Sequence, residues 1–244
     1  MEDGDRSMQG CREIAAPAQV DIAEEFKDFA YIVSHDLAGP VRSVVGFSQL
    51  LTERVNTAPS EEDRLHLELI IESGQKLNDM IQGLLSFSRL NTVARAPEKV
   101  DLEIVLARCH MELQAKLDAT SGQLVYPPMP GIMADPARMF TLFHAVIDNA
   151  IKFRKYGIPP DVRVSVTECP DRYQFAIEDN GIGIDPMFYD DVFRPFRKLH
   201  TDDAYPGVGM GLTLARKIVI QHGGEIWLEA SPQGGLSVCF SLAK

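Results

Sequence analysis

The sequence predicts two structural parts, a helical hairpin at residues 20–91 and an α/β sandwich at residues 101–244. Apolar residues recur every three or four positions in the first part, which is typical of amphipathic helices. In the second part, helical stretches are mixed with short runs in which apolar and polar residues alternate, as in hairpin strands. The 244 residues are 45% hydrophobic, which is enough to build a buried core.

Composition excludes several classes of protein. Lys and Arg number 24 against 35 Asp and Glu, so the net charge is −11. Such a balance argues against binding to nucleic acid, which needs a basic face. No run of about 18 apolar residues occurs, so we expect no direct membrane insertion.

The first part begins after a polar tail at residues 1–19. Its two helices flank a turn at residues 56–60, where Ser60 followed by three acidic residues is typical of a helix N-terminus. One hairpin cannot cover its own apolar seam, whereas two can, as a four-helix bundle. We therefore expect a homodimer.

Residues 92–100 contain a proline and few apolar side chains, so they are expected to be a linker. The elements predicted beyond it are helices at 101–120, 136–155 and 211–222, and strands near 162–166, 175–177, 225–229 and 236–242. Helices combined with hairpin strands favour an α/β sandwich over a doubly wound parallel sheet.

Glycines and polar residues form a possible phosphate site in the second part. Gly181 and Gly183 follow a strand, and a second glycine motif opens a helix at Gly207, Gly209 and Gly211. Glycines let the backbone approach a ligand, and a helix N-terminus attracts phosphate. Either motif alone is equally typical of a helix-entry turn.

Three side chains add to this pattern. Asn149 offers an amide oxygen to a hard cation that bridges phosphates. Lys152 lies on the same helix face and can reach an anion. Asp179 ends a strand and could accept a hydrogen bond from an adenine amino group, or serve only as a turn residue.

His35 is the candidate nucleophile of the first part. It stands beside the apolar seam, where it should reach solvent, and Asp36 follows it. A histidine with an ordinary pKa of about 6.5 is mostly neutral at pH 7 and therefore nucleophilic. Asp36 could take the proton that the ring must shed.

Together these motifs resemble the transmitter module of two-component sensor histidine kinases, over about residues 20–244. Residues 29–51 are similar to the phosphoacceptor box and residues 148–153 to the asparagine box. The remaining matches are the end of the second dimerisation helix at 84–90, the glycine boxes at 179–184 and 207–212, the phenylalanine box at 193–196, and Gly235 with Ser237 as a third glycine box. Residues 198–207 and the acid after His35 are most similar to the phytochrome-type branch.

The resemblance implies an ATP-binding fold shared with gyrase and Hsp90, with a mobile lid at residues 186–206 anchored by Phe193 and Phe196. ATP and Mg²⁺ would be the cofactors, and Asn149 would hold the metal. Lys152 and Lys198 would face the phosphates, and Asp179 would recognise adenine. The implied cofactor-binding set is Asn149, Lys152, Asp179, Gly181, Gly183, Lys198, Gly207, Gly209, Gly211 and Leu212.

The implied reaction is phosphorylation of His35 by ATP, with Asp36 as the second catalytic residue, followed by transfer to an aspartate of a response-regulator receiver domain. A sensor domain is expected to be missing or to lie in a separate protein. The expected location is the bacterial cytoplasm, although a longer parent protein could be attached to a membrane.

Two departures from the family pattern affect the expected activity. Gly39 stands where Thr or Asn usually orients a water, so phosphatase activity is expected to be weak or absent. Ala145 replaces an asparagine four residues before Asn149. The alternatives are a catalytically silent ATP-binding scaffold and a gyrase-type ATPase using Asp148, although the latter would leave the hairpin unexplained.

Overall fold

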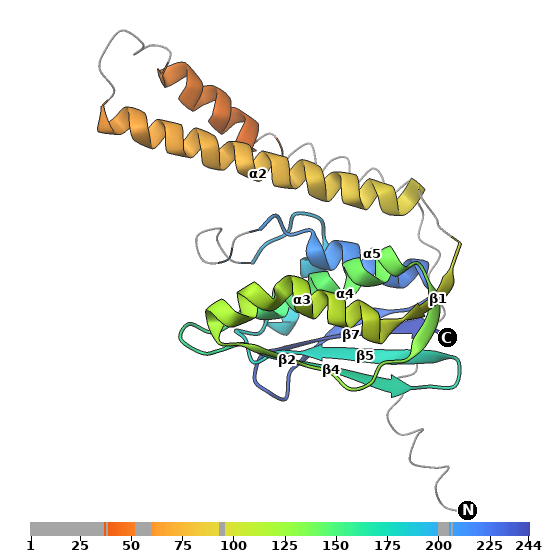
Figure 1. Ribbon diagram of the computed structural model, residues 1–244. Helices are drawn as coiled ribbons and strands as arrows, with labels where there is room; N and C mark the ends of the chain where they lie inside the picture. The colour runs from red at the N-terminus through yellow and green to blue at the C-terminus, as the bar shows by residue number, and fades with distance from the viewer. Residues whose placement is uncertain (1–36, 38, 52–59, 93–95, 200–204, 206) are drawn as a thin grey trace, which may run out of the picture. The chain divides into compact units, whose positions relative to one another are not determined.

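The computed structural model describes residues 37, 39–51, 60–92, 96–199, 205 and 207–244 (Figure 1). The chain divides into two compact units. Within the described residues, the α/β unit contains Thr92–Arg194 and Gly211–Lys244, and the helical unit contains residues 39–91 and Pro195–Met210. The predicted fold class, a helical hairpin followed by an α/β domain, is confirmed.

The helical unit consists mainly of a helix at residues 39–51 and helix α2 (Glu61–Thr92). Helix α2 begins with reciprocal hydrogen bonds. Ser60 Oγ accepts from the Asp63 backbone N–H at 3.2 Å, and Asp63 Oδ2 accepts from Ser60 N and Oγ, both at 2.7 Å. This cap satisfies donors that the first turn would otherwise leave unpaired, so the predicted helix start is confirmed.

The α/β unit is built on a five-stranded sheet with the order β2-β4-β5-β7-β6. Strand β2 runs parallel to β4, and the other neighbours are antiparallel. Its strands are β2 (Gln123–Val125), β4 (Asp161–Glu168), β5 (Arg172–Glu178), β6 (Ile226–Ala230) and β7 (Leu236–Ala243). A separate two-stranded sheet pairs β1 (Glu98–Asp101) with β3 (Gly131–Ala134). Strand β1 therefore begins inside the segment expected to be a linker.

Three helices cover one face of the five-stranded sheet (Figure 1): α3 (Leu102–Thr120), α4 (Pro136–Lys152) and α5 (Gly211–Gln221). Phe143 of α4 is fully buried and packs edge-on against Phe175 of β5 and Phe240 of β7, at ring-centroid distances of 5.6 and 5.4 Å. This aromatic cluster fixes α4 against the sheet, so the side chains at the helix's C-terminal end are held in place.

Local departures from the predicted elements have simple causes. Helix α4 ends at Lys152 instead of residue 155, because Phe153 leaves the helical region at ψ 32° while its N–H still bonds Asn149 O. The expected lid contains two short 3₁₀ turns, η1 (Pro186–Phe188) and η2 (Asp191–Phe193). Among the described residues, no helix has the length and apolar character needed to cross a membrane.

Candidate functional site

Asp179 directly follows strand β5, and its side chain is 6% exposed. Its Oδ1 accepts hydrogen bonds from Gly181 N at 2.8 Å and Leu236 N at 3.0 Å. Within the described part of the chain, Oδ2 accepts none, so this oxygen is available to a ligand. Burial raises the pKa of the Asp179 carboxyl, while the two backbone bonds and the charge of Lys155 lower it.

Glycines surround this carboxylate because side chains would not fit. A Cβ on Gly235 would collide with Asp179 Oδ1, and one on Gly181 with the Phe153 carbonyl oxygen. Gly183 has a φ of +69°, which L side chains rarely adopt. The loop after β5 and the turn before β7 can therefore close around Asp179 only with glycine at these positions.

The C-terminal end of α4 carries Asn149 and Lys152, one helical turn apart. A Cβ on Gly211 would lie 3.5 Å from Asn149 Nδ2, so the start of α5 lies beside Asn149. The next residue, Leu212, is half-buried in the same first turn. This arrangement places an amide side chain next to a helix N-terminus, which suits a cation bound together with phosphate.

Burial and two neighbouring charges shift the pKa of Lys152. Its Nζ lies 4.3 Å from the centroid of the Phe153 ring. Burial lowers the pKa of Lys152, Asp148 raises it, and Lys116 lowers it further. Asp148 in turn forms an ion pair with Lys116 of α3 at 2.5 Å, so this carboxylate is already engaged by a cation.

Other candidate residues belong to the helical unit. Lys198 Nζ donates to the Tyr205 carbonyl at 3.1 Å. Gly209 has a φ of +74°, and a Cβ there would lie 2.7 Å from the Arg197 carbonyl oxygen; Gly207 has a φ of +134°. The structure brings Asn149, Lys152, Asp179, Gly181, Gly183, Gly211 and Leu212 together in the α/β unit, and places Lys198, Gly207 and Gly209 in the other.

The candidate nucleophile His35 and its neighbour Asp36 lie outside the described residues, so their roles stay predictions. The phenylalanine box is divided. Phe193 is buried in the α/β unit, where the Arg216 guanidinium lies 5.5 Å from its ring centroid. Phe196 belongs to the helical unit and has a φ of +59°. The lid movement expected of this segment also stays a prediction.

Two polar residues near Asp179 escaped the sequence analysis. Asn180 accepts from Asp161 N and donates to the Pro159 carbonyl, both at 3.0 Å, which ties the glycine loop to β4. Lys155 Nζ donates to the Gly234 carbonyl at 3.1 Å across 79 positions. An Asn before Gly indicates a turn, whereas no local pattern indicates the partner of Lys155.

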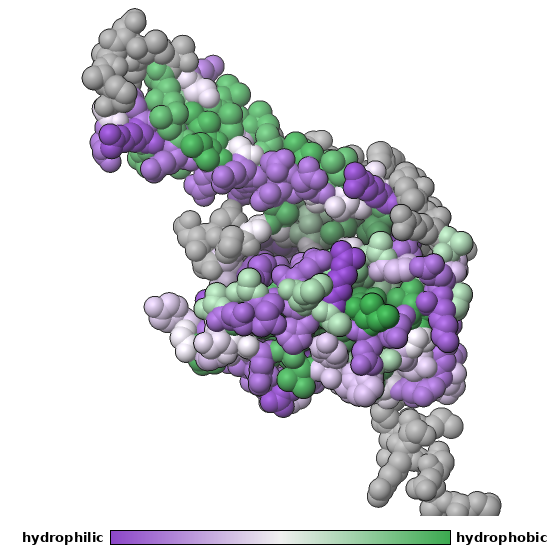
Figure 2. Space-filling model, in the orientation of Figure 1, coloured by the Kyte–Doolittle hydropathy of each residue, from purple (hydrophilic) through white to green (hydrophobic). Residues whose placement is uncertain are grey.

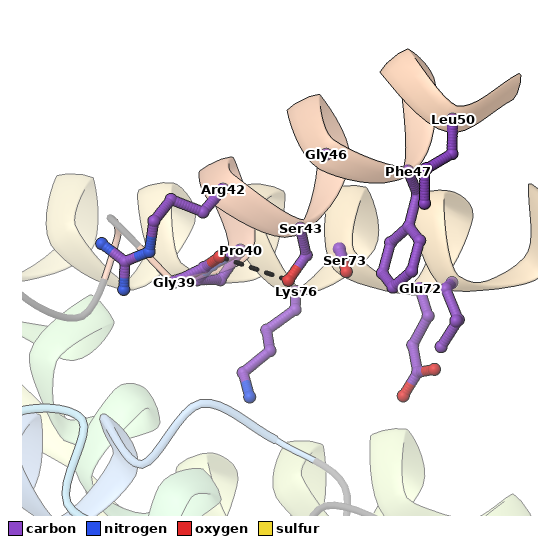
Figure 3. A pocket seen from close by; sticks show the side chains of 11 residues that line it. Gly39, Pro40, Arg42, Ser43, Gly46, Phe47, Leu50, Glu72, Ser73 and Lys76 are labelled. Atoms are coloured by element: carbon purple, nitrogen blue, oxygen red, sulfur yellow. Dashed lines mark hydrogen bonds between the residues drawn. The ribbon is translucent and has the colours of Figure 1, made fainter. Parts of the chain in front are cut away.

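The helical unit contains a groove of about 900 Å³ between the 39–51 helix and α2. Its apolar lining is Phe47, Leu50 and Leu69, and its charged lining is Arg42, Glu72 and Lys76. Figure 3 shows Ser43 and Phe47 pointing from the 39–51 helix toward α2. The ring of Phe47 stacks on His66 with a centroid distance of 5.4 Å.

Apolar side chains also remain exposed along α2. We call Leu67, Ile71, Ile81 and Leu85 the α2 stripe, because their spacing of 4, 10 and 4 positions puts them on one helix face. Their side chains are 40–57% exposed. Figure 2 shows apolar residues gathered on the helical hairpin. Such a stripe is the usual mark of an interaction surface.

Comparison with known families identifies both units. Residues 134–244 match the family described as "Histidine kinase-, DNA gyrase B-, and HSP90-like ATPase". Residues 27–93 match the family described as "His Kinase A (phospho-acceptor) domain". Together the two matches make up the transmitter module of a histidine kinase.

Similar proteins support this assignment. The chain is 34% identical to cyanobacterial phytochrome A of Nostoc sp. and 33% identical to the phytochrome-like protein Cph1 of Synechocystis sp., over 89% of its own length. It spans 28% and 29% of these relatives, less than a third of each.

Solved structures show the same fold at lower identity. Acinetobacter baumannii histidine kinase AdeS has a TM-score of 0.62 and 22% identity, covering 86% of this chain and 97% of that one. Histidine kinase ThkA in complex with the response regulator TrrA has a TM-score of 0.67 and 17% identity, covering 91% of this chain and 64% of that one.

Proposed function

We propose that this chain is the catalytic output module of a histidine protein kinase, which phosphorylates His35 from ATP and passes the phosphoryl group to an aspartate of a response-regulator receiver domain. The observation that carries the proposal is the position of the C-terminal end of α4 in a unit of the ATPase family. Asn149 lies beside the start of α5, and the Phe153 carbonyl accepts a hydrogen bond from Ile182 N, in the loop that follows Asp179, at 3.0 Å. This end of α4 joins a base-recognition carboxylate to a phosphate-binding helix end.

The α/β unit fits a nucleotide. Asp179 Oδ2 can accept from the adenine amino group, since Oδ1 is held by two backbone donors. The N-terminus of α5 and Lys152 supply positive charge for the phosphates. Mg²⁺ would be held by Asn149 and would neutralise charge on the phosphates. The phosphate-binding roles of Lys198, Gly207 and Gly209 stay predictions from the sequence.

The proposed reaction at His35 is an in-line displacement. A ring nitrogen of His35 attacks the γ-phosphorus, the bond to the β–γ bridging oxygen breaks, and that oxygen keeps the electron pair as ADP leaves. Asp36 accepts the proton that the imidazole ring loses. The phosphoryl group then passes from the ring nitrogen to a carboxylate oxygen of the receiver aspartate.

A second copy of the chain is the proposed occupant of the exposed hairpin surface. The α2 stripe and the apolar side of the groove leave large side chains in water within a single chain. Pairing two hairpins in a four-helix bundle would bury them. The complex of ThkA with TrrA supports a response regulator as the other partner.

Further parts of the proposal concern input and location. Because ATP is the phosphoryl donor, we place the reaction in the cytoplasm. A sensor domain, in the same or a separate protein, is proposed to control the module. Phosphatase activity is proposed to be weak, because Gly39 offers no side chain to orient a water.

The test is incubation with γ-labelled ATP and magnesium, comparing wild type with His35→Gln. Label on the wild type should be acid-labile and base-stable, as expected of phosphohistidine, and should be absent from His35→Gln. His66→Gln is the matched control on the other helix of the hairpin, and it should keep the label.

Other results would redirect the proposal. ATP binding without label on any variant would identify a silent scaffold. Steady hydrolysis of ATP without protein label would favour a gyrase-type ATPase. The position of Asp148 next to Asn149 on α4 argues against the latter, because adjacent side chains on a helix point about 100° apart.

A further inference from the structure

Lys155 occupies an unusual place next to the proposed base-binding carboxylate. It lies in the loop after α4, where Ile158 N bonds its carbonyl at 3.1 Å to form a turn. Its side chain crosses to the turn between β6 and β7 and donates to Gly234 O at 3.1 Å. The hydrogen bond joins two segments that lie 79 positions apart in the chain.

The β6–β7 turn is the wall of the Asp179 site. Gly234 has a φ of +84°, and its N–H bonds the Ser231 carbonyl at 2.9 Å. The adjacent Gly235 lies so close to Asp179 Oδ1 that no Cβ would fit, and Leu236 N bonds the same oxygen at 3.0 Å. A shift of Gly234 would therefore move the groups that orient Asp179.

Lys155 is also a charge partner of this carboxylate. Its ammonium group lowers the pKa of Asp179, against the upward effect of burial. On the neighbouring strand β4, Asp161 and Arg163 are paired with each other at 2.8 Å, and Glu178 of β5 acts on Arg163. The β6–β7 turn and residues 180–184 contain no ionisable side chain.

We propose that Lys155 is a positioning residue for nucleotide base recognition: it fastens the β6–β7 turn around Asp179 and gives the buried carboxylate a nearby positive charge. This inference rests on the proposed function, because it assumes that Asp179 binds adenine. Lys155 itself need not touch the nucleotide. Lys155 acts on Asp179 in two ways: its hydrogen bond to Gly234 holds the β6–β7 turn in place, and its positive charge favours the ionised form of the carboxyl.

The expected pH dependence follows from the ionised form of Asp179, which accepts the hydrogen bond from an amino group. Affinity for ADP should be present above the pKa of Asp179 and should fall as the pH decreases through it. Removing the Lys155 charge raises that pKa, so the loss of affinity should begin at a higher pH. Loss of the hydrogen bond to Gly234 also loosens the β6–β7 turn, which should lower the affinity for ADP by a smaller amount at every pH.

The experiment compares wild type with Lys155→Met and Lys155→Arg, with Lys99→Met on β1 as a control that removes the same charge elsewhere. Titration of the Asp179 carboxyl by carbon-13 NMR in the nucleotide-free protein should show a higher pKa in Lys155→Met than in wild type. ADP binding by calorimetry should weaken several-fold in Lys155→Met at acidic pH and less at pH 8. Lys155→Arg should restore both, and Lys99→Met should match wild type.

Each other outcome has a definite meaning. If wild type binds ADP and Lys155→Met has the same affinity and the same Asp179 titration, the inference is wrong while the proposed function stands. An equal loss in Lys155→Arg would also contradict it, because the charge and reach are kept. If wild type itself fails to bind ADP, the proposed function is wrong and this inference is lost with it.

Discussion

The two units of this chain bury their apolar side chains to very different extents. In the α/β unit, Phe143 and Phe240 are fully buried between helix and sheet. In the helical unit, Val45 and Ile71 remain 50% and 57% exposed. A sheet covered by helices completes a core within one chain, whereas two helices leave one face of each in water. The difference indicates that the α/β unit is stable alone and that the hairpin gains stability by association.

The largest expected effect tests this contrast directly. Phe143→Ala should lower the free energy of unfolding of the α/β unit by about 4 kcal/mol, because it leaves a cavity in a closed core. Phe47→Ala on the hairpin should cost about 1 kcal/mol, since its ring is only half-buried. Urea unfolding of the α/β unit can be followed by fluorescence of Trp227, the single tryptophan, which lies in that unit, and unfolding of the hairpin by circular dichroism of its helices. Similar losses for both variants would contradict the comparison.

The second prediction separates function from stability within the α/β unit. Asp179→Asn should weaken ADP binding about 100-fold, since the amide can present a donor to the adenine amino group. The fold should remain, because an amide oxygen can still accept from Gly181 N and Leu236 N.

The same variant has a pH signature. Burial raises the pKa of Asp179 in the folded state, so wild-type stability falls as the pH rises from the ordinary carboxyl pKa through the folded one, and remains lower above it. Asn does not titrate, so the stability advantage of Asp179→Asn should grow with pH over that range. Melting temperatures of both proteins measured from pH 3 to pH 8 would reveal it, and a difference between variant and wild type that stays constant or reverses its trend over that range would contradict it.

A third prediction concerns the exposed hairpin surface. Ile71→Ala on the α2 stripe should weaken dimerisation by about 2 kcal/mol, or about 30-fold in Kd, because a two-fold interface loses the side chain twice. Ile104→Ala is a matched control, since Ile104 is 69% exposed on α3 of the other unit. Sedimentation equilibrium would measure both. Equal dimerisation of Ile71→Ala and wild type would place the interface elsewhere.

The smallest expected effect concerns Gly39 on the 39–51 helix. A Cβ there would meet nothing within 4 Å in the described structure, so Gly39→Thr should fold normally. It should raise dephosphorylation of the phosphorylated receiver several-fold, about 1 kcal/mol, by giving a water a hydroxyl partner. Gly74→Thr on α2, where the space is also open, should leave that rate unchanged. An equal rate in Gly39→Thr and wild type would remove Gly39 as the cause of weak phosphatase activity.

The sequence alone determined most elements and the family of this protein. The apolar period located α2 and α4, and the cap of Ser60 located the start of α2, since these signals depend on neighbours in the chain. The end of α4 was predicted at residue 155 and lies at Lys152. Glycine motifs and Asp179 indicated a nucleotide site, because glycine is needed where backbone and ligand must approach closely. The short strands β1, β2 and β3 were missed, since three or four residues show no measurable period.

Only the tertiary structure decided which residues serve the Asp179 site. The bond from Lys155 to Gly234 spans 79 positions, and that from Leu236 to Asp179 spans 57. The requirement for glycine at Gly181 and Gly235 arises from the Phe153 carbonyl and the Asp179 carboxylate, neither of which is an immediate neighbour in the chain. The pattern of apolar and polar residues along the chain indicates which helices and strands form. Contacts such as these depend instead on how the sheet brings its strand ends and turns together in space.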